Sequence, residues 1–167
     1  MAQFALTQSI KKQTEIIFYN MEIAMKTCNW SEKICGTDAW RYIYHTLHSC
    51  DRWFINPEHF IEPSIHTPLL DKVDIKTDSY LSKEELWDYF EQVKHKTLDY
   101  LEHLSDEELY EKPKDCSRTK VELILGQYRH FMCHIGILNG VTIATTNKYP
   151  MVVGLEGARD GKLFDEG

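Results

Sequence analysis

The sequence has no long hydrophobic run, no basic stretch and no secretory leader pattern. Its apolar runs are far shorter than the roughly 20 residues that span a bilayer, so we expect neither a transmembrane helix nor a membrane partner. The formal net charge is −7, without a basic stripe, which argues against binding to nucleic acids. Residues 1–12 lack a basic region followed by an apolar core, and we therefore expect no signal peptide.

The cysteines also lack the spacing of a zinc knuckle or a redox motif, because no pair is separated by two residues. Their number is odd, which is typical of reduced thiols and predicts a cytoplasmic protein. The chain has 167 residues, of which 43% are hydrophobic. This is enough for a packed core, and we expect a single domain over residues 1–167. The cysteines are Cys28, Cys35, Cys50, Cys116 and Cys133.

No segment has the alternating pattern of a strand, and apolar residues recur instead at helical spacing. We therefore expect an all-α fold of four helices followed by a coil tail. In the first helix, the apolar face is made by residues spaced three, four or seven apart, namely Leu6, Ile10, Ile17, Met21 and Ala24. The four expected helices and the tail cover residues 4–27, 39–54, 82–104, 117–144 and 145–167.

Capping signals mark the expected starts of the later helices. Ser82 and Glu85 form a capping box, in which a serine and a glutamate three residues later satisfy free backbone N–H groups. Ser105 and Glu108 repeat the pattern and predict a short helical turn. Ser117 is the expected cap of the last helix.

Residues 55–80 break the helical pattern and contain Pro57, Pro63 and Pro68. A loop of this length is uncommon in a compact domain and needs a geometric reason. A crossover connection explains the length of the loop. If the third helix runs parallel to the second, the chain must first travel back along the whole bundle. We therefore predict an up-down-down-up four-helix bundle with one long crossover between the second and third helices. Residues 55–80 either cover a binding site or pack along the bundle.

Residues that can carry chemistry gather in the last helix, where His130 and His134 are four residues apart. This spacing puts both imidazoles on one helix face, about 6 Å apart along the axis. In a helix bundle, a third metal ligand can come from a facing helix. The second helix offers His45 and His48, which lie one turn apart on nearly the same face, so helical geometry does not choose between them.

Three imidazoles with an open fourth position are typical of a catalytic zinc site, where water or substrate takes the open position. A cation in such a site lowers the pKa of bound water toward ~7. Nickel, iron or manganese can occupy the same donor set, because first-row affinities depend on metal availability as well as on the ligands. The pattern predicts a divalent metal and a small-molecule substrate. The histidine ligands alone do not decide which metal it is, and we expect zinc or nickel.

Two stretches of the chain resemble the DinB-like (DinB/YfiT-like) superfamily of metalloenzymes. Trp40–Leu47 is similar to the second-helix motif of that family, which carries one metal-binding histidine. Arg129–Asn139 is similar to the fourth-helix motif, which carries two more. The resemblance covers most of the chain, from the second helix through Gly140, and it implies a four-helix bundle of the topology predicted above.

Carried over residue by residue, the resemblance implies that His45, His130 and His134 hold the metal. The histidine of the family motif is followed by threonine and leucine, as His45 is, so the resemblance favours His45 over His48. It also implies a homodimer. Some members of the superfamily resemble or are thiol-dependent S-transferases. The resemblance therefore also implies this activity, with a low-molecular-weight thiol as a cofactor.

No separate general base stands out, and His48 and Asp51 are the nearest candidates for catalytic residues. Asp51 can also orient a ligand imidazole through the free N–H of that ring. A second hypothesis is a non-catalytic bundle whose metal is structural or absent, and which serves partner binding or stress protection.

We expect four other histidines to be solvated, namely His59, His66, His95 and His103.

Overall fold

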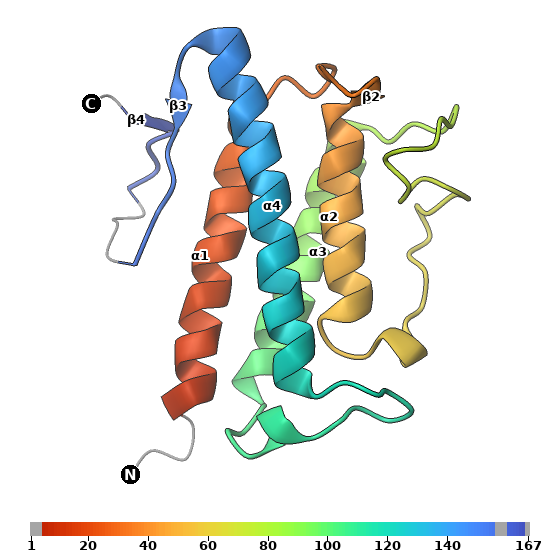
Figure 1. Ribbon diagram of the computed structural model, residues 1–167, viewed down its shortest axis with the longest axis vertical. Coiled ribbons are helices and arrows are strands. Elements are labelled where there is room, and N and C mark those ends of the chain that lie inside the picture. The colour runs from red at the N-terminus through yellow and green to blue at the C-terminus, as the bar shows by residue number, and fades with distance from the viewer. Residues whose placement is uncertain (1–4, 156–159, 166–167) are drawn as a thin grey trace.

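The computed structural model describes residues 5–155 and 160–165 of the chain. Four α-helices make up most of it, and short elements occupy the connections between them (Figure 1). The prediction of an all-α fold is therefore confirmed at the level of the helices. They are α1 (Ala5–Thr27), α2 (Ala39–Trp53), α3 (Lys83–Glu102) and α4 (Lys120–Thr146).

The capping boxes predicted the start of α3 and of a short helical turn. The Ser82 hydroxyl accepts a hydrogen bond from the Glu85 N–H, and the Glu85 carboxylate accepts one from the Ser82 N–H. The same reciprocal pair joins Ser105 and Glu108, where the 3-10 helix η2 (Glu108–Tyr110) begins. The expected start of the first helix at Phe4 lies outside the described residues.

The expected cap of the last helix at Ser117 is wrong, because α4 is capped by Thr119. Thr119 and Glu122 form a complete capping box, with the backbone N–H of each donating to the side chain of the other. Ser117 has Lys120 three residues later, so it lacks the carboxylate that completes the box.

Short antiparallel strands are present although the sequence predicted none. β1 (Lys33–Ile34) pairs with β2 (Thr37–Asp38) ahead of α2. The two residues of the turn between them, Cys35 and Gly36, have φ values of 50° and 86°. Positive φ at both central residues is the geometry of a two-residue hairpin, and glycine adopts it without steric cost. Strands of two residues are too short to show an alternating pattern.

The tail predicted as coil from residue 145 also contains regular structure. The helix α4 continues to Thr146, and β3 (Tyr149–Pro150) then pairs with β4 (Phe164–Asp165). The buried Asn20 side chain of α1 holds the tail at Val153, donating to its carbonyl oxygen (3.0 Å) and accepting from its N–H (2.8 Å).

The helices α1 and α2 each contact both α3 and α4, so the four helices stand side by side (Figure 1). Phe18 of α1 lies edge-on to Phe90 of α3 and to Phe131 of α4, with ring centroids 5.8 and 5.3 Å apart. On α2, Tyr44 and Leu47 are fully buried. Among the described helices, none combines the length and the apolarity that crossing a membrane requires.

The crossover segment, residues 55–80, runs beside α2 and is drawn in yellow to green in Figure 1. It begins with the 3-10 helix η1 (Pro57–His59). Arg41 of α2, which is only 5% exposed, fixes its later part. The guanidinium donates hydrogen bonds to three backbone carbonyl oxygens of the crossover, those of Leu69 (3.1 Å), Lys72 (2.5 Å) and Ile75 (2.8 Å). Leu70 is fully buried in the core, so the crossover segment is packed against the helices.

Candidate metal centre

Three histidine side chains meet between α2 and α4. His45 comes from α2, and His130 and His134 come from one face of α4. The Nε2 atom of His130 lies 3.0 Å from Nε2 of His45 and 3.2 Å from Nε2 of His134. The ring centroids are 4.5 to 4.9 Å apart. The structure therefore brings together three imidazole nitrogens that can hold a metal ion.

The spacing of these nitrogens fits a divalent cation. Zinc–imidazole bonds of about 2.0–2.1 Å in tetrahedral geometry place neighbouring nitrogens ~3.3 Å apart. The observed separations of 3.0 and 3.2 Å are close to that value. A neutral imidazole carries a lone pair on its unprotonated nitrogen, so a cation between three of them relieves the repulsion of the lone pairs. Three ligands leave one tetrahedral position for another molecule.

The backbone of the crossover segment orients one of the rings. Nδ1 of His45 lies 2.6 Å from the carbonyl oxygen of Asp71. A carbonyl oxygen can only accept, so Nδ1 carries the proton and Nε2 keeps the lone pair that faces His130. Metal-binding histidines are commonly held in one tautomer by such a partner. The Nδ1 atoms of His130 and His134 are buried, and among the described residues they have no hydrogen-bond partner.

Burial keeps these imidazoles uncharged. Burial, together with a smaller effect of the neighbouring imidazoles, lowers the pKa of His130 to about 4 and that of His134 to about 3. Burial also lowers the pKa of His45, although its hydrogen bond to Asp71 acts in the opposite direction. The three rings are therefore neutral at neutral pH, which is the form that binds a metal.

A hollow of about 290 Å³ lies beside His45, between α2 and the crossover segment. Its volume suits a small molecule rather than a macromolecule. Arg52 and Lys72 bring positive charge to it, and Lys72 is paired with Asp71 at 2.9 Å. The lining side chains are those of His45, His48, Ser49, Arg52, Trp53, Asp71 and Lys72.

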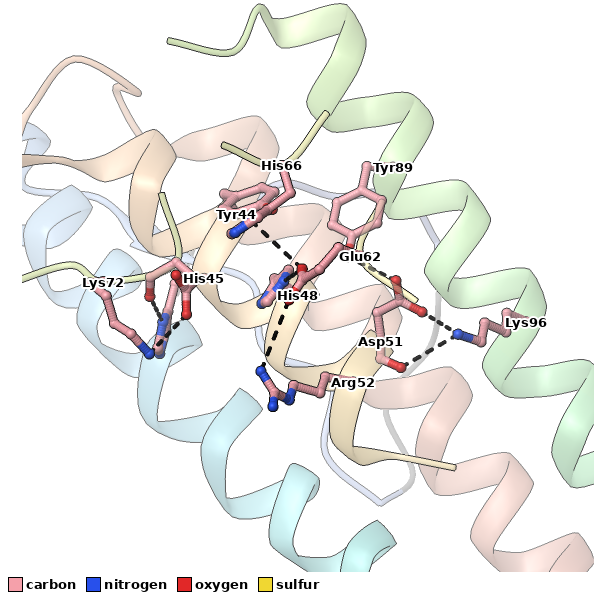
Figure 2. Close-up of polar contacts among 11 residues, drawn as sticks. Tyr44, His45, His48, Asp51, Arg52, Glu62, His66, Lys72, Tyr89 and Lys96 are labelled. Carbon is pink, nitrogen blue, oxygen red and sulfur yellow. Dashed lines mark hydrogen bonds and ion pairs between the residues drawn. The ribbon is translucent and has the colours of Figure 1, made fainter. Parts of the chain in front are cut away.

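The competing histidine of α2 faces a different group. Nε2 of His48 lies 2.6 Å from Oε2 of Glu62, and its ring stacks on that of His66 with centroids 4.9 Å apart. Figure 2 shows His48 beside these two residues of the crossover segment, with His45 one helical turn away. The geometry thus places His45 with the histidines of α4, as the resemblance favoured, while metal binding itself stays a prediction.

Asp51 does not lie where an orienting carboxylate is needed. It accepts hydrogen bonds from the Tyr89 hydroxyl (2.9 Å) and from Nζ of Lys96 (2.5 Å), both on α3 (Figure 2). Six residues turn a helix by about 600°, so Asp51 points about 120° away from His45. The backbone carbonyl of Asp71 has the orienting role that the sequence analysis proposed for Asp51.

The expectation that His66 is solvated is wrong, because its side chain is 17% exposed. Its Nδ1 atom lies 2.7 Å from the Tyr44 hydroxyl. Glu62 was not among the predicted site residues, although it lies four residues before His66 in the sequence. Glu62 directly precedes Pro63, whose carbonyl oxygen accepts a hydrogen bond from the His66 N–H three residues later (2.9 Å).

Comparisons with known proteins do not identify a family. No protein-family model matches the chain, and neither a curated protein nor a solved structure matches it. The resemblance to the DinB-like superfamily therefore rests on the two stretches Trp40–Leu47 and Arg129–Asn139. The geometry of the three histidines carries the functional argument.

Proposed function

We propose that this protein is a metal-dependent enzyme in which His45, His130 and His134 hold one divalent cation. The observation that carries the proposal is the approach of three Nε2 atoms, with separations of 3.0 and 3.2 Å about His130. Zinc or nickel is the proposed ion, and iron or manganese is compatible with the same ligands. When bound, the cation supplies Lewis acidity to a molecule in the remaining position.

By analogy with the DinB-like superfamily, we propose that the sulfur of a low-molecular-weight thiol attacks an electrophilic carbon of a small molecule. A C–S bond forms, the bond from that carbon to its leaving group breaks, and the thiol proton and the leaving group pass to solvent. We propose membership of that superfamily and an up-down-down-up bundle with one crossover. The long segment between α2 and α3 and the helix contacts support this topology.

The residues around the hollow support a small polar substrate. The Arg52 guanidinium can bind a carboxylate of a thiol or of its acceptor, and Ser49 offers a hydroxyl. Of the two candidate catalytic residues, His48 lines the hollow, whereas Asp51 is engaged with α3. The thiolate is the nucleophilic form of a thiol, so the reaction requires a group that lowers the pKa of the bound thiol.

Metal analysis of the protein purified without an affinity tag tests the proposal. The His130→Ala, His134→Ala double variant is expected to hold one ion per chain fewer than the unmodified protein. His103→Ala serves as the control, because that side chain is 74% exposed and lies outside the group of three. Equal metal content in the unmodified protein and the double variant, after incubation with zinc, nickel and manganese, would refute the metal centre.

The reaction is tested separately, on protein that has been loaded with metal. Several low-molecular-weight thiols are assayed with a generic electrophile, and the His130→Ala, His134→Ala variant provides the background rate. Rates above that background support a transferase. Background rates with every thiol would favour the alternative of a non-catalytic bundle with a structural metal.

We further propose that the protein is a homodimer. Gly136 and Gly140 lie on an exposed face of α4, where an added Cβ would meet no atom within 4 Å. That face is free to approach the same face of a second copy closely. Sedimentation equilibrium should give about twice the chain mass of 19.7 kDa, and a value equal to one chain would refute the dimer.

A further inference from the structure

A second cluster of metal-binding side chains lies one helical turn from the first. It consists of His48 of α2 and of Glu62 and His66 of the crossover segment (Figure 2). The ligand atoms of these three residues lie within 4.8 Å of one another. The metal centre proposed above does not use any of them.

The backbone and the packing hold the three side chains in place. The turn at Pro63, closed by the His66 N–H, brings Glu62 and His66 to the same side of the crossover segment. His48 is 3% exposed, and the ring of Phe60 packs edge-on against it at 5.3 Å and 90°. Two of the ligands therefore come from one turn, and the third is fixed inside the fold.

The carboxylate of Glu62 lies near one nitrogen of each imidazole. Its Oε2 atom is 2.6 Å from Nε2 of His48 and 3.9 Å from Nδ1 of His66. The two rings are nearly parallel, with 19° between their planes. Two imidazoles and one carboxylate are the donor set of many zinc sites and of iron(II) sites with a facial triad.

A cation at this cluster would take the place of the proton that Nε2 of His48 donates to the Glu62 carboxylate. The Tyr44 hydroxyl lies 2.7 Å from Nδ1 of His66. Burial raises the pKa of the Tyr44 phenol, which therefore keeps its proton and can donate to Nδ1 in the tautomer that leaves this nitrogen unprotonated. Arg52 approaches Glu62 only to 4.0 Å and is 43% exposed, so it does not form a close ion pair with the carboxylate.

We propose that His48, Glu62 and His66 form a second site for a divalent transition metal, which attaches the crossover segment to α2. Its ligands differ from those of the three-histidine centre, so each site can exist without the other. A bound ion would replace the Tyr44 hydroxyl as the partner of Nδ1 of His66. Because two ligands come from the crossover segment and one from α2, binding joins parts of the chain that are otherwise held by hydrogen bonds and packing.

Counting zinc ions per chain tests the proposal. The full-length protein without a tag is treated with a chelator, loaded with zinc and freed of excess by gel filtration. Two ions per chain are expected for the unmodified protein, one for the Glu62→Gln, His66→Gln variant and one for the His130→Ala, His134→Ala variant. His59→Gln is the matched control, because His59 and Asp115 form an exposed pair at 2.9 Å outside the cluster, and it should keep two ions.

The pattern of loss separates the two sites. An unmodified protein with a single ion, which persists in the Glu62→Gln, His66→Gln variant, overturns the second site and leaves the three-histidine centre intact. A single ion that is lost only in this variant supports the second site and overturns the three-histidine centre. If the double variant does not fold by circular dichroism, Glu62→Gln alone replaces it, since glutamine keeps the shape of the side chain and a hydrogen-bond acceptor for His48.

A substitution at Tyr44 provides an independent readout. Tyr44→Phe removes the hydroxyl that competes for Nδ1 of His66 and keeps the buried ring. The zinc dissociation constant of the second site, measured in the His130→Ala, His134→Ala background, should fall by roughly two- to tenfold, the worth of one hydrogen bond. An unchanged or higher constant would overturn the assignment of Nδ1 as a metal donor.

Discussion

The Nδ1 atom of His45 lies 2.6 Å from the backbone carbonyl oxygen of Asp71, so the crossover segment directly orients a side chain of the candidate metal centre. The position of this carbonyl is fixed on both sides along the chain. The preceding residue, Leu70, is fully buried, and the carbonyl oxygen of the following residue, Lys72, accepts a hydrogen bond from Arg41. The crossover segment is therefore part of the site as well as a connection between helices.

Replacing Arg41 should destabilise the protein strongly. Arg41→Met leaves the carbonyl oxygens of Leu69, Lys72 and Ile75 without their donor. We expect the free energy of unfolding to fall by roughly 2–4 kcal/mol in urea denaturation, since hydrogen bonds to a charged group contribute more than neutral ones. Lys33→Met is the control, because its ion pair with Asp38 is exposed and should contribute less than about 1 kcal/mol. Similar losses in both variants would contradict this role of Arg41.

Truncating Leu70 tests whether the crossover segment belongs to the core. Leu70→Ala removes a fully buried side chain and should lower the free energy of unfolding by roughly 2–5 kcal/mol. Ile61→Ala makes a comparable truncation in the same segment at a side chain that is 86% exposed, and it should change stability by less than about 0.5 kcal/mol. A crossover segment that only covered the surface would give two small values.

The helices and their starts were largely predictable because the signals are local. Apolar spacing locates α1 to α4, and the box formed by Ser82 and Glu85 marks the start of α3. The prediction at Ser117 was wrong by two residues, because α4 is capped by Thr119. Only Thr119 has a carboxylate three residues later, and that reciprocal pair decided the start of α4.

The surroundings of the histidines were less predictable because they depend on the path of the crossover segment. Helical spacing identifies His130 and His134 as neighbours, but it cannot place His66 against His48, since no periodicity describes residues 55–80. The partner of His45 is a backbone carbonyl, a group that every residue has, so the sequence contains no signal for it. Because a backbone carbonyl gives no signal in the sequence, the carboxylate of Asp51 was the candidate for orienting the imidazole. The ring of His45 is instead oriented by the backbone carbonyl of Asp71.

Removing the cap of α4 should have a measurable cost. Thr119→Ala deletes the side chain that accepts the hydrogen bond of the Glu122 N–H, and it should lower the free energy of unfolding by about 1 kcal/mol. Ser117→Ala is the matched control, with a value near zero expected, because that residue precedes the capping box. Urea denaturation of both variants checks the assignment, and a larger loss for Ser117→Ala would place the cap at the residue expected from the sequence.

The stability of the metal-free protein should decrease as the pH falls from about 6.5 toward 4. In the folded protein, burial lowers the pKa of His130 from 6.5 to about 4 and that of His134 to about 3. Between these values the unfolded chain binds protons that the folded protein does not, so acid favours unfolding. Stability is therefore highest above pH 6.5, and the contribution of these residues is lost as the pH falls through the folded pKa of His130. Melting temperatures measured over this range in the presence of a chelator check the direction.

The matched comparison uses a His130→Gln, His134→Gln variant, in which neither side chain titrates. Its melting temperature should depend less steeply on pH between 6.5 and 4 than that of the unmodified protein, because the difference in bound protons is smaller. His103→Gln should retain the steep dependence, since the His103 side chain is 74% exposed. If the His130→Gln, His134→Gln variant kept the full pH dependence, the acid sensitivity would arise from other groups, and the two α4 imidazoles would not be held neutral by burial.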